Sequence, residues 1–448
     1  MPELKLSELI GALSHALDIT EGQPEGHCVR CCWIGMHIGE KIGMSSVHLW
    51  DLYYMLLLKD LGCSSNASRI CELYLTDDLS FKRDFKWVDG SLPQLLRFIL
   101  RHTGPNSGLL DRLKALGTIL QNGEEIAQEL IQTRCTRGAD IARQLRFSEE
   151  VAHGIHCLDE HWNGQGRPQG LQGSCIPLYS RIALLAQVID VVNNTNGQLA
   201  AIAEARNRSG SWFDPELVEA FTEVSQSPDF WTILTSSEVE PRIFALEPGD
   251  HKVQLDEDYF DDIAEAFGKV VDAKSPYTAG HSARVGLYTS LLAESMEIPE
   301  ARRRWLKRGA LLHDVGKLGV SNSILDKPGK LDEIEWAAVK RHAQFTESIL
   351  GRISSFDELA RVSAAHHERL DGGGYPRGIA GTDIVLETRI ITTADIFDAI
   401  TAERPYRGAV PVDKTLAIME ENVGTAIDAN CFVSLKNLIK NNPELFPG

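Results

Sequence analysis

Apolar residues recur every three or four positions along most of this chain, which is the period of an α-helix with one buried face. The stretches DDIAEAFGKVV (261–271) and SARVGLYTSLLAESM (282–296) show the pattern, and short loops rich in glycine and proline separate such segments. Runs that alternate apolar and polar residues, as half-buried strands do, are few. The pattern predicts a mainly helical, all-α protein.

One stretch interrupts this helical pattern near the middle of the chain. Residues 236–255 are rich in charge, contain two prolines and include a Pro-Gly-Asp turn, a composition typical of a linker. With 448 residues, the chain is long enough for more than one hydrophobic core. We therefore predict two domains, 1–235 and 256–448.

Two distant segments share a common pattern. HHERLDGGGYPRGIAGTDIVLETRI (366–390) and LDEHWNGQGRPQGLQGSCIPLYSRI (158–182) can be aligned with Pro376 over Pro168. Both then keep a Gly-x-Gly turn, an x-Pro, a second glycine cluster and a Ser/Thr-Arg-Ile. Only the later copy has two adjacent histidines at its start, so the copies differ where metal-binding chemistry is expected.

Further matches occur in the same order in both halves. EGHCVR (25–30) matches AGHSAR (279–284), and LLLKDLG (56–62) matches ALLHDVG (310–316). The histidine of the first pair and the aspartate of the second are 33 residues apart in both copies. The halves are therefore predicted to be a tandem duplication of one helical bundle, with about 46 extra residues inserted in the first copy.

The second half contains an ordered series of metal-ligand residue types. These are His281, His313, Asp314, His342, His366, His367 and Asp395. Each lies in or beside a segment of helical pattern, so helices packed as a bundle could turn these side chains toward one internal site. Imidazole together with carboxylate favours first-row metals such as iron, manganese or zinc.

Seven ligands are too many for one ion, and the series therefore predicts two divalent ions, preferably iron or manganese. Asp314 is the expected bridge between them, because it lies in the middle of the series and beside His313. Two ions about 3.5–4 Å apart can hold a hydroxide and a phosphoryl group for in-line attack on a phosphate ester. We therefore expect Asp314 to be essential for catalysis.

Basic residues near this series indicate a phosphorylated substrate. Lys317 follows Asp314 by one helical turn and is expected to contact a phosphate or to assist the leaving oxygen. Arg404 and Arg407 follow Asp395, and guanidinium groups suit bidentate phosphate contacts. Their grouping predicts a substrate with more than one phosphate.

The motifs of the second half resemble those of the HD-GYP family, a branch of the HD phosphohydrolases. They are YTAGHSARV, LLHDVGKLGV, ILDKPGKL, KRHAQ, HHERLDGGGYP and TADIFDAITAERPYR, and they cover roughly residues 256–430. The resemblance implies a helical bundle with a two- or three-metal centre that hydrolyses a cyclic dinucleotide, usually cyclic di-GMP, to pGpG or GMP. It also implies that Gly374, Tyr375 and Pro376 form a signature loop beside the site. Some members with a third metal have a Glu where this chain has Tyr277, so two ions are expected here.

The first half lacks most of the ligand set. Aligned residue by residue, Lys59 replaces His313, Leu158 replaces His366, Asp159 replaces His367 and Gln187 replaces Asp395, while His102 is the candidate equivalent of His342. A lysine ammonium at a ligand position repels a dication, and the few remaining ligands cannot hold a metal pair. We expect a degenerate, metal-free domain with a structural, dimerising or regulatory role.

Three functions are consistent with these residues. The first is a cyclic di-GMP phosphodiesterase, and the second is a phosphodiesterase for 3′,3′-cyclic GMP-AMP. The third is a receptor or scaffold that binds cyclic dinucleotides or diguanylate cyclases (GGDEF proteins) without turnover. The intact ligand set argues against the third, because a receptor does not need seven metal-binding side chains. A homodimer is a further expectation.

Composition excludes other classes of partner. The net charge of −18 argues against binding to a nucleic-acid polymer, which requires a basic surface. No apolar run approaches 18 residues, and the first residues do not resemble an export signal. The nine cysteines are irregularly spaced and are expected to be free thiols. A cytoplasmic protein without a membrane span is therefore expected.

Overall fold

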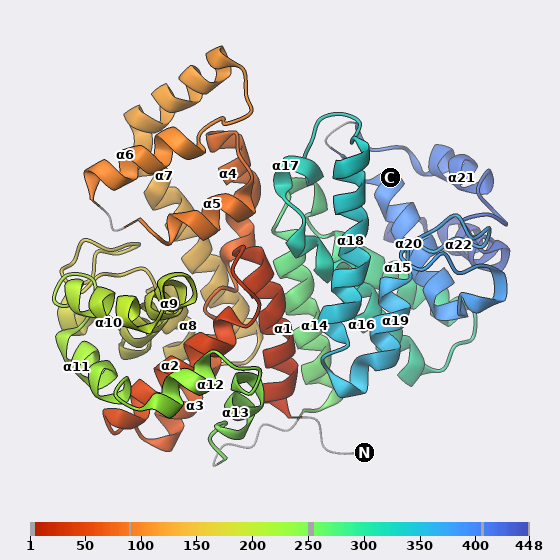
Figure 1. The fold of residues 1–448 in the computed structure, drawn as a ribbon. Coiled ribbons are helices and arrows are strands. Elements are labelled where there is room, and N and C mark those ends of the chain that lie inside the picture. The colour runs from red at the N-terminus through yellow and green to blue at the C-terminus, as the bar shows by residue number, and fades with distance from the viewer. Residues whose placement is uncertain (1–4, 89–90, 250–254, 405–406, 447–448) are drawn as a thin grey trace. The chain divides into compact units, whose positions relative to one another are not determined.

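The structure is a computed structural model that describes residues 5–88, 91–249, 255–404 and 407–446. In these ranges the chain forms helices, turns and isolated bridges but no named strand, and the all-α prediction is confirmed. The chain divides into two compact units, Met1–Asp256 and Glu257–Gly448 (Figure 1).

The first unit contains the helices of the degenerate copy and of its insertion. In chain order these are α1 (Leu6–Thr20), α2 (His27–Lys41), α3 (Ser46–Leu58), η1 (Cys63–Asn66), α4 (Ala67–Tyr74), α5 (Asp78–Phe85), α6 (Leu92–His102), α7 (Leu109–Gln144), α8 (Glu149–His156), η2 (Gly173–Cys175), α9 (Leu178–Asn196), α10 (Gln198–Asn207), α11 (Pro215–Val224), α12 (Pro228–Leu234) and α13 (Val239–Ala245). Among the residues that the structure describes, no helix is long and apolar enough to cross a membrane.

The second unit is a helical bundle of similar plan. Its elements are α14 (Glu257–Asp272), η3 (Pro276–Thr278), α15 (His281–Ser295), α16 (Glu300–Leu312), η4 (Val315–Gly319), α17 (Asn322–Leu325), α18 (Glu333–Leu350), η5 (Ser354–Phe356), α19 (Asp357–Ala364), η6 (Gly381–Asp383), α20 (Leu386–Thr401), α21 (Val412–Glu420), α22 (Ala429–Asn441) and η7 (Pro443–Leu445). Figure 1 shows them in green to blue. The order of elements from α14 to α20 repeats that of α1 to α9, apart from the insertion in the first unit.

Local sequence explains where the helices of the second unit begin. Helix α18 starts with a capping box, in which the side chain of Asp332 accepts from the amide of Glu335 and the Glu335 carboxylate accepts from the amide of Asp332. Helix α15 starts after Gly280, whose φ of 70° favours glycine. The side chain of Asp272 then accepts hydrogen bonds from the amide and hydroxyl of Ser282, which caps the exposed amides of α15. This geometry places His281 in the first turn of α15.

An apolar core holds α15, α16 and α20 together at one end of the second unit. Its buried members include Val285, Leu306, Ile391, Phe397 and Leu435. His281 and Asp395 lie on α15 and α20, and His313 and Asp314 directly follow α16. The core therefore helps to position these four predicted ligands.

The predicted linker differs from the structure in its first half. Residues 239–245 form helix α13, in which Val239 and Ile243 are buried. Glu247, just after this helix, accepts hydrogen bonds from the side chains of Ser7 and Tyr54. The first unit thus continues to Asp256 rather than to 235. The charges of this segment obscured a short helix with only two buried apolar residues.

The insertion predicted in the first copy comprises α4, α5, α6 and the first part of α7. It has a small core of its own, made of Ile70, Phe81, Val88 and Phe98. Helix α7 is interrupted at Asn122, whose φ of −120° and ψ of 18° are not helical. All nine cysteines of the chain are free, and most are buried in the first unit.

Candidate metal centre

The structure brings together all seven predicted ligand side chains of the second half. They come from five places in the fold: the start of α15 (His281), the turn just after α16 (His313, Asp314), the middle of α18 (His342), the turn after α19 (His366, His367) and α20 (Asp395). All are buried except His367, which is half-buried. Residues more than 100 positions apart thus converge on one small volume.

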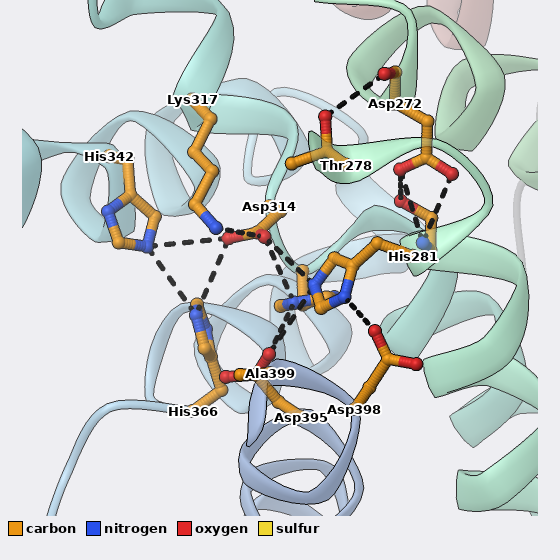
Figure 2. Close-up of polar contacts among 12 residues, drawn as sticks. Asp272, Thr278, His281, Asp314, Lys317, His342, His366, Asp395, Asp398 and Ala399 are labelled. Carbon is orange, nitrogen blue, oxygen red and sulfur yellow. Dashed lines mark hydrogen bonds and ion pairs between the residues drawn. The ribbon is translucent and has the colours of Figure 1, made fainter. Parts of the chain in front are cut away.

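The two carboxylate oxygens of Asp314 face two different groups of histidines. Its Oδ2 lies 3.4 Å from His281 Nε2 and 3.3 Å from His313 Nε2. Its Oδ1 lies 3.5 Å from His342 Nε2 and 3.7 Å from His366 Nε2. Figure 2 shows His342 and His366 on one side of Asp314 and His281 on the other. This is the arrangement expected of a carboxylate that bridges two ions.

One more predicted ligand lies beside each of the two groups of histidines. On one side, Asp395 Oδ1 lies 3.4 Å from His281 Nε2 and 3.8 Å from His313 Nε2. On the other side, His367 joins His342 and His366, and one nitrogen from each ring lies within 4.8 Å of the others. One ion would therefore meet mixed imidazole and carboxylate donors, and the other mainly imidazoles, a set that suits a first-row transition metal.

Hydrogen bonds at the far ring nitrogen fix the orientation of the histidines. The Nδ1 atoms of His313, His342 and His366 each lie 2.6 Å from a carbonyl oxygen three residues earlier. A carbonyl only accepts, so each Nδ1 carries a proton, and Nε2 is the ring nitrogen that faces the centre and is left to bind a metal when the ring is neutral. Backbone carbonyls thus select the tautomer that a metal requires.

His281 is fixed by a carboxylate that the sequence reasoning missed. Its Nδ1 lies 2.7 Å from Asp398 Oδ2, and Arg284 holds the same carboxylate with an Nε–Oδ1 distance of 2.5 Å. The first unit repeats this set, because His27 Nδ1 lies 2.6 Å from Asp190 Oδ2 and Arg30 also binds that carboxylate. Persistence of the aspartate in both copies was the signal that could have revealed it.

Several buried polar atoms at the centre have no hydrogen-bond partner within the described chain. They are His281 Nε2, His313 Nε2 and Asp314 Oδ1. Buried polar atoms without a partner are costly and therefore rare in native proteins. These three atoms all point at the volume between the ligands, so the residues present fit a pair of divalent cations.

The surroundings of the predicted ligands shift the pKa values of several of them. Burial alone would raise the pKa of Asp314, but His313 and Lys317 hold it well below its usual range. Burial lowers the pKa of His342 to about 4 and that of His367 to about 3. These two rings are therefore neutral at pH 7, as metal ligands must be.

Lys317 and the loop of Gly374, Tyr375 and Pro376 lie beside the predicted ligands. Lys317 lies on η4, and its ammonium binds Asp314 Oδ2. The ring of Tyr375 lies 4.8 Å from that of His367, centroid to centroid, and Pro376 follows it through a cis peptide bond. A Cβ on Gly374 would lie only 2.5 Å from the carbonyl oxygen of His367, so only glycine permits this close approach.

The two arginines predicted to bind phosphate have different surroundings. Arg404 lines a hollow that Lys317 also lines, and among the residues that the structure describes its guanidinium has one long contact, 3.5 Å from Nε to the carbonyl oxygen of Ala399. The guanidinium of Arg407 donates to the carbonyls of Ile400 and Ala399 at 2.7 and 2.6 Å. Arg404 remains available for a phosphate, whereas the geometry of Arg407 is that of a residue bracing the turn after α20.

The corresponding place in the first unit holds a lysine ammonium. Lys59 Nζ binds Asp60 Oδ2 and lies 3.1 Å from His27 Nε2 and 3.3 Å from Gln187 Oε1. His27, Asp60 and Gln187 align with the ligands His281, Asp314 and Asp395. The ammonium therefore contacts the residues that align with three ligands of the second unit.

The prediction that His102 stands in place of His342 is wrong. A Cβ on Gly316 would lie 1.9 Å from the carbonyl oxygen of His342, and a Cβ on Gly62 would lie 1.9 Å from that of Arg134. Since Gly62 and Gly316 each follow the bridging aspartate position by two residues, Arg134 is the equivalent of His342. The Arg134 guanidinium binds Asp159, at the His367 position. His102 instead lies on α6, in the insertion, where alignment by sequence could not exclude it.

Comparisons with known proteins agree with these features. The chain matches the HD domain family over residues 115–217 and 265–431. It is 59% identical to the 3′3′-cGAMP-specific phosphodiesterase 3 of Vibrio cholerae over 98% of this chain and 95% of that protein. It is 36% identical to the cyclic di-GMP phosphodiesterase response regulator RpfG of Xanthomonas campestris, over 37% of this chain and 45% of that one.

A solved structure covers the same length. A crystal structure of a cyclic GMP-AMP specific phosphodiesterase of V. cholerae aligns with a TM-score of 0.68 and 52% identity, over 99% of this chain and 100% of that chain. The relatives named for cyclic di-GMP match a smaller part of this chain. The sequence prediction placed cyclic di-GMP first and cyclic GMP-AMP second, and the comparisons support the second better.

Proposed function

This chain belongs to the HD domain family, with a second unit of HD-GYP type, and from that premise we propose that it is a metal-dependent phosphodiesterase of 3′,3′-cyclic GMP-AMP. The observation that supports the chemistry most directly is that the two carboxylate oxygens of Asp314 face different histidines. Oδ2 faces His281 and His313, and Oδ1 faces His342 and His366. A single cation could not use both oxygens and all of these rings.

The residues that would hold the metals follow from this geometry. We assign His281, His313 and Asp395 to one ion, His342, His366 and His367 to the other, and Asp314 to both. We propose two ions, iron or manganese. Such a pair supplies Lewis-acid stabilisation of a phosphoryl group and a nucleophile derived from water.

The chain's own residues then bind and orient the substrate. Arg404 lines the adjoining hollow, where a guanidinium can form charge-assisted hydrogen bonds to a phosphate. Lys317 lies between that hollow and Asp314, so its ammonium can neutralise charge that develops on the leaving 3′ oxygen. The carbonyls and Asp398 that hold the outer ring nitrogens keep the histidines in one orientation through the reaction.

The preference for cyclic GMP-AMP is supported by the relative that matches nearly the whole chain. A side-by-side assay of 3′,3′-cyclic GMP-AMP and cyclic di-GMP with the full chain, followed by chromatography of the products, tests it. We expect cyclic GMP-AMP to give the larger kcat/KM, and His342→Ala to abolish hydrolysis. His102→Ala, a histidine outside the site, serves as the matched control. Equal or greater activity on cyclic di-GMP would overturn the preference, and full activity of His342→Ala would overturn the site.

We propose that the first unit is a metal-free structural or regulatory partner. Lys59 and Arg134 supply fixed positive charge near the carboxylates of Asp60 and Asp159. These two carboxylates, which could otherwise bind a metal, are thus already paired with cations of the chain itself. A deletion that leaves residues 257–448 tests this role: equal stability, solubility and activity of the remaining unit would contradict it.

A homodimer is the partner proposal that the surface supports best. Leucines on α6 and the first part of α7 are largely exposed: Leu92, Leu96, Leu100, Leu109, Leu110, Leu113 and Leu120. Apolar patches of several hundred Å² mark interaction sites, and a standard interface covers roughly 800 Å² per partner. Association with diguanylate cyclases through the Gly-Tyr-Pro loop is a second proposal. Sedimentation of the chain alone and with such an enzyme would separate the two.

A further inference from the structure

Two hollows adjoin the metal centre, and one side chain lines both. The first, of about 200 Å³, is lined by Lys317 and Arg404 together with apolar residues of α14, α17 and α18. The second, of about 370 Å³, is lined by His366, His367 and Tyr375. Trp336, on α18, lines both hollows and leaves 46% of its surface exposed. The indole therefore presents exposed aromatic surface beside both hollows.

Trp336 is the outer end of a row of rings that leads into the metal centre. Its ring lies edge-on to that of Tyr375, with centroids 6.1 Å apart and an interplanar angle of 83°. Tyr375 in turn lies 4.8 Å from His367. The edge-on packing against Tyr375 holds the indole while its surface remains available to the hollows.

The first hollow has the chemistry of a nucleobase site rather than of a phosphate site. Val271, Leu325, Leu331 and Val339 supply apolar walls. Lys327, also in the lining, is neutralised by Glu335 at 2.6 Å. Lys274, a further cation of the lining, is buried and donates a hydrogen bond to the carbonyl oxygen of Leu318. The other two cations, Lys317 and Arg404, are the residues assigned above to phosphate. A nucleotide with its phosphate at these cations would place its base among the apolar walls.

We propose that Trp336 stacks on the adenine of 3′,3′-cyclic GMP-AMP in the first hollow. This inference rests on the proposed function and extends it to a base-binding residue. Stacking of a purine on an indole requires an exposed aromatic face within reach of the phosphate site, which Trp336 provides.

The lining of the first hollow favours adenine over guanine. Guanine presents N–H donors on its base-pairing edge, which carboxylates accept well. Among the described residues that line this hollow, none is an aspartate or a glutamate. In the second hollow, Arg369 is paired with Asp371 at 2.5 Å, and the Glu368 carboxylate accepts from the amides of Arg377 and Ile379. The ammonium of Lys340, also in this lining, is of the type that binds the O6 and N7 acceptors of guanine. The charged side chains of the two hollows thus differ in a way that suits adenine in the first and guanine in the second.

The kinetic test compares Trp336→Ala and Trp336→Phe with the wild-type chain, all loaded with metal. Loss of base stacking costs about 1–3 kcal/mol, so Trp336→Ala is expected to raise the KM for cyclic GMP-AMP by roughly 5- to 150-fold with little change in kcat. Trp336→Phe retains a ring and is expected to recover most of the affinity. Ile334→Ala, on the same helix and 82% exposed, is the matched control and should leave KM unchanged.

A spectroscopic test addresses the base itself. Non-hydrolysable phosphorothioate analogues of cyclic GMP-AMP and cyclic di-GMP are titrated into the wild type and into Trp336→Phe. Stacking predicts that the first analogue quenches tryptophan fluorescence in the wild type, that Trp336→Phe loses this quench, and that the second analogue quenches less.

The outcomes separate this inference from the function on which it rests. If the wild type hydrolyses neither cyclic dinucleotide, the proposed function fails. If it hydrolyses cyclic GMP-AMP and Trp336→Ala keeps the wild-type KM, the stacking role is overturned. Equal quenching by both analogues would overturn the assignment of adenine to this hollow.

Discussion

Removal of the Lys59 ammonium should destabilise the first unit far more than removal of an ordinary surface charge. Lys59 is fully buried against Asp60, His27 and Gln187. Burial by itself would raise the pKa of Asp60, but the ammonium beside it holds that pKa well below its usual range. Lys59→Met removes the nearest compensating charge and leaves a buried carboxylate.

The size of the effect follows from the burial of the pair. Breaking a buried ion pair by removal of one partner costs about 3–5 kcal/mol. Lys86 also lowers the pKa of Asp60 and remains in the variant, so the lower end, about 3 kcal/mol, is expected. For a unit of this size each kcal/mol shifts the melting temperature by about 2–4 °C, so a fall on the order of 10 °C is expected.

Urea unfolding followed by tryptophan fluorescence measures this loss in the full chain. Six of the eight tryptophans, at positions 33, 50, 87, 162, 212 and 231, lie in the first unit, so the signal reports mainly on that unit. The double variant Lys59→Met/Asp60→Asn removes the stranded charge and should recover more than half of the loss. Lys41→Met breaks a half-exposed pair with Glu223 and should cost less than about 1 kcal/mol.

Two results would refute this reasoning. A Lys59→Met chain as stable as Lys41→Met would show that the buried ammonium does not hold the first unit together. A double variant no more stable than Lys59→Met would show that the stranded carboxylate is not the cause of the loss.

Three further results are expected. Arg404→Ala should raise the KM by roughly 10- to 150-fold, as loss of a charge-assisted hydrogen bond of about 1.5–3 kcal/mol predicts. Arg407→Ala should lower the melting temperature with a smaller change in KM, and the reverse order would contradict their assignment. A chelator should lower the melting temperature of the second unit in calorimetry and leave that of the first unit unchanged, because ligands that bind only the folded state stabilise it. Equal shifts of the two melting temperatures would contradict the assignment of the metals to the second unit alone. Burial and the nearby Lys59 ammonium lower the pKa of His27 in the folded protein. Below about pH 6.5 the unfolded chain therefore binds a proton at His27 that the folded chain does not bind. The free energy of unfolding of the first unit should fall from pH 7 to pH 5. His27→Gln should reduce this slope in urea midpoints, and an unchanged slope would assign it elsewhere.

The ligand series of the second unit could be predicted from sequence because its chemistry limits the residue types. The sequence contains the adjacent His313 and Asp314 and, further along, the adjacent His366 and His367. This combination is rare enough to indicate one site. Helical periodicity then indicated that these residues lie on packed helices. The structure added the division of Asp314 between two groups, which depends on side-chain directions that spacing does not determine.

Residues that act through another residue were harder to predict. Asp398 lies one helical turn after Asp395 and could have been found, because the duplicated copy keeps Asp190 while it loses the ligand beside it. Arg134 could not have been found in this way. The insertion shifts the alignment, and only the close approach of Gly62 to the Arg134 carbonyl reveals the equivalence.

The helix inside the predicted linker was not foreseen for a related reason. The segment that contains α13 is polar on average, and its two buried residues, Val239 and Ile243, give too weak a period to indicate a helix. Its place in the first unit depends on tertiary contacts such as those of Glu247 with Ser7 and Tyr54. Such contacts override local propensity.

Metal analysis of the purified full chain tests the central claim most directly. Elemental analysis after anaerobic purification, in parallel with a hydrolysis assay of 3′,3′-cyclic GMP-AMP, is compared between the wild type and Asp314→Ala. We predict two divalent ions per chain in the wild type, and loss of both the ions and the hydrolysis in Asp314→Ala. An Asp314→Ala chain that keeps two ions and the wild-type rate would contradict the account.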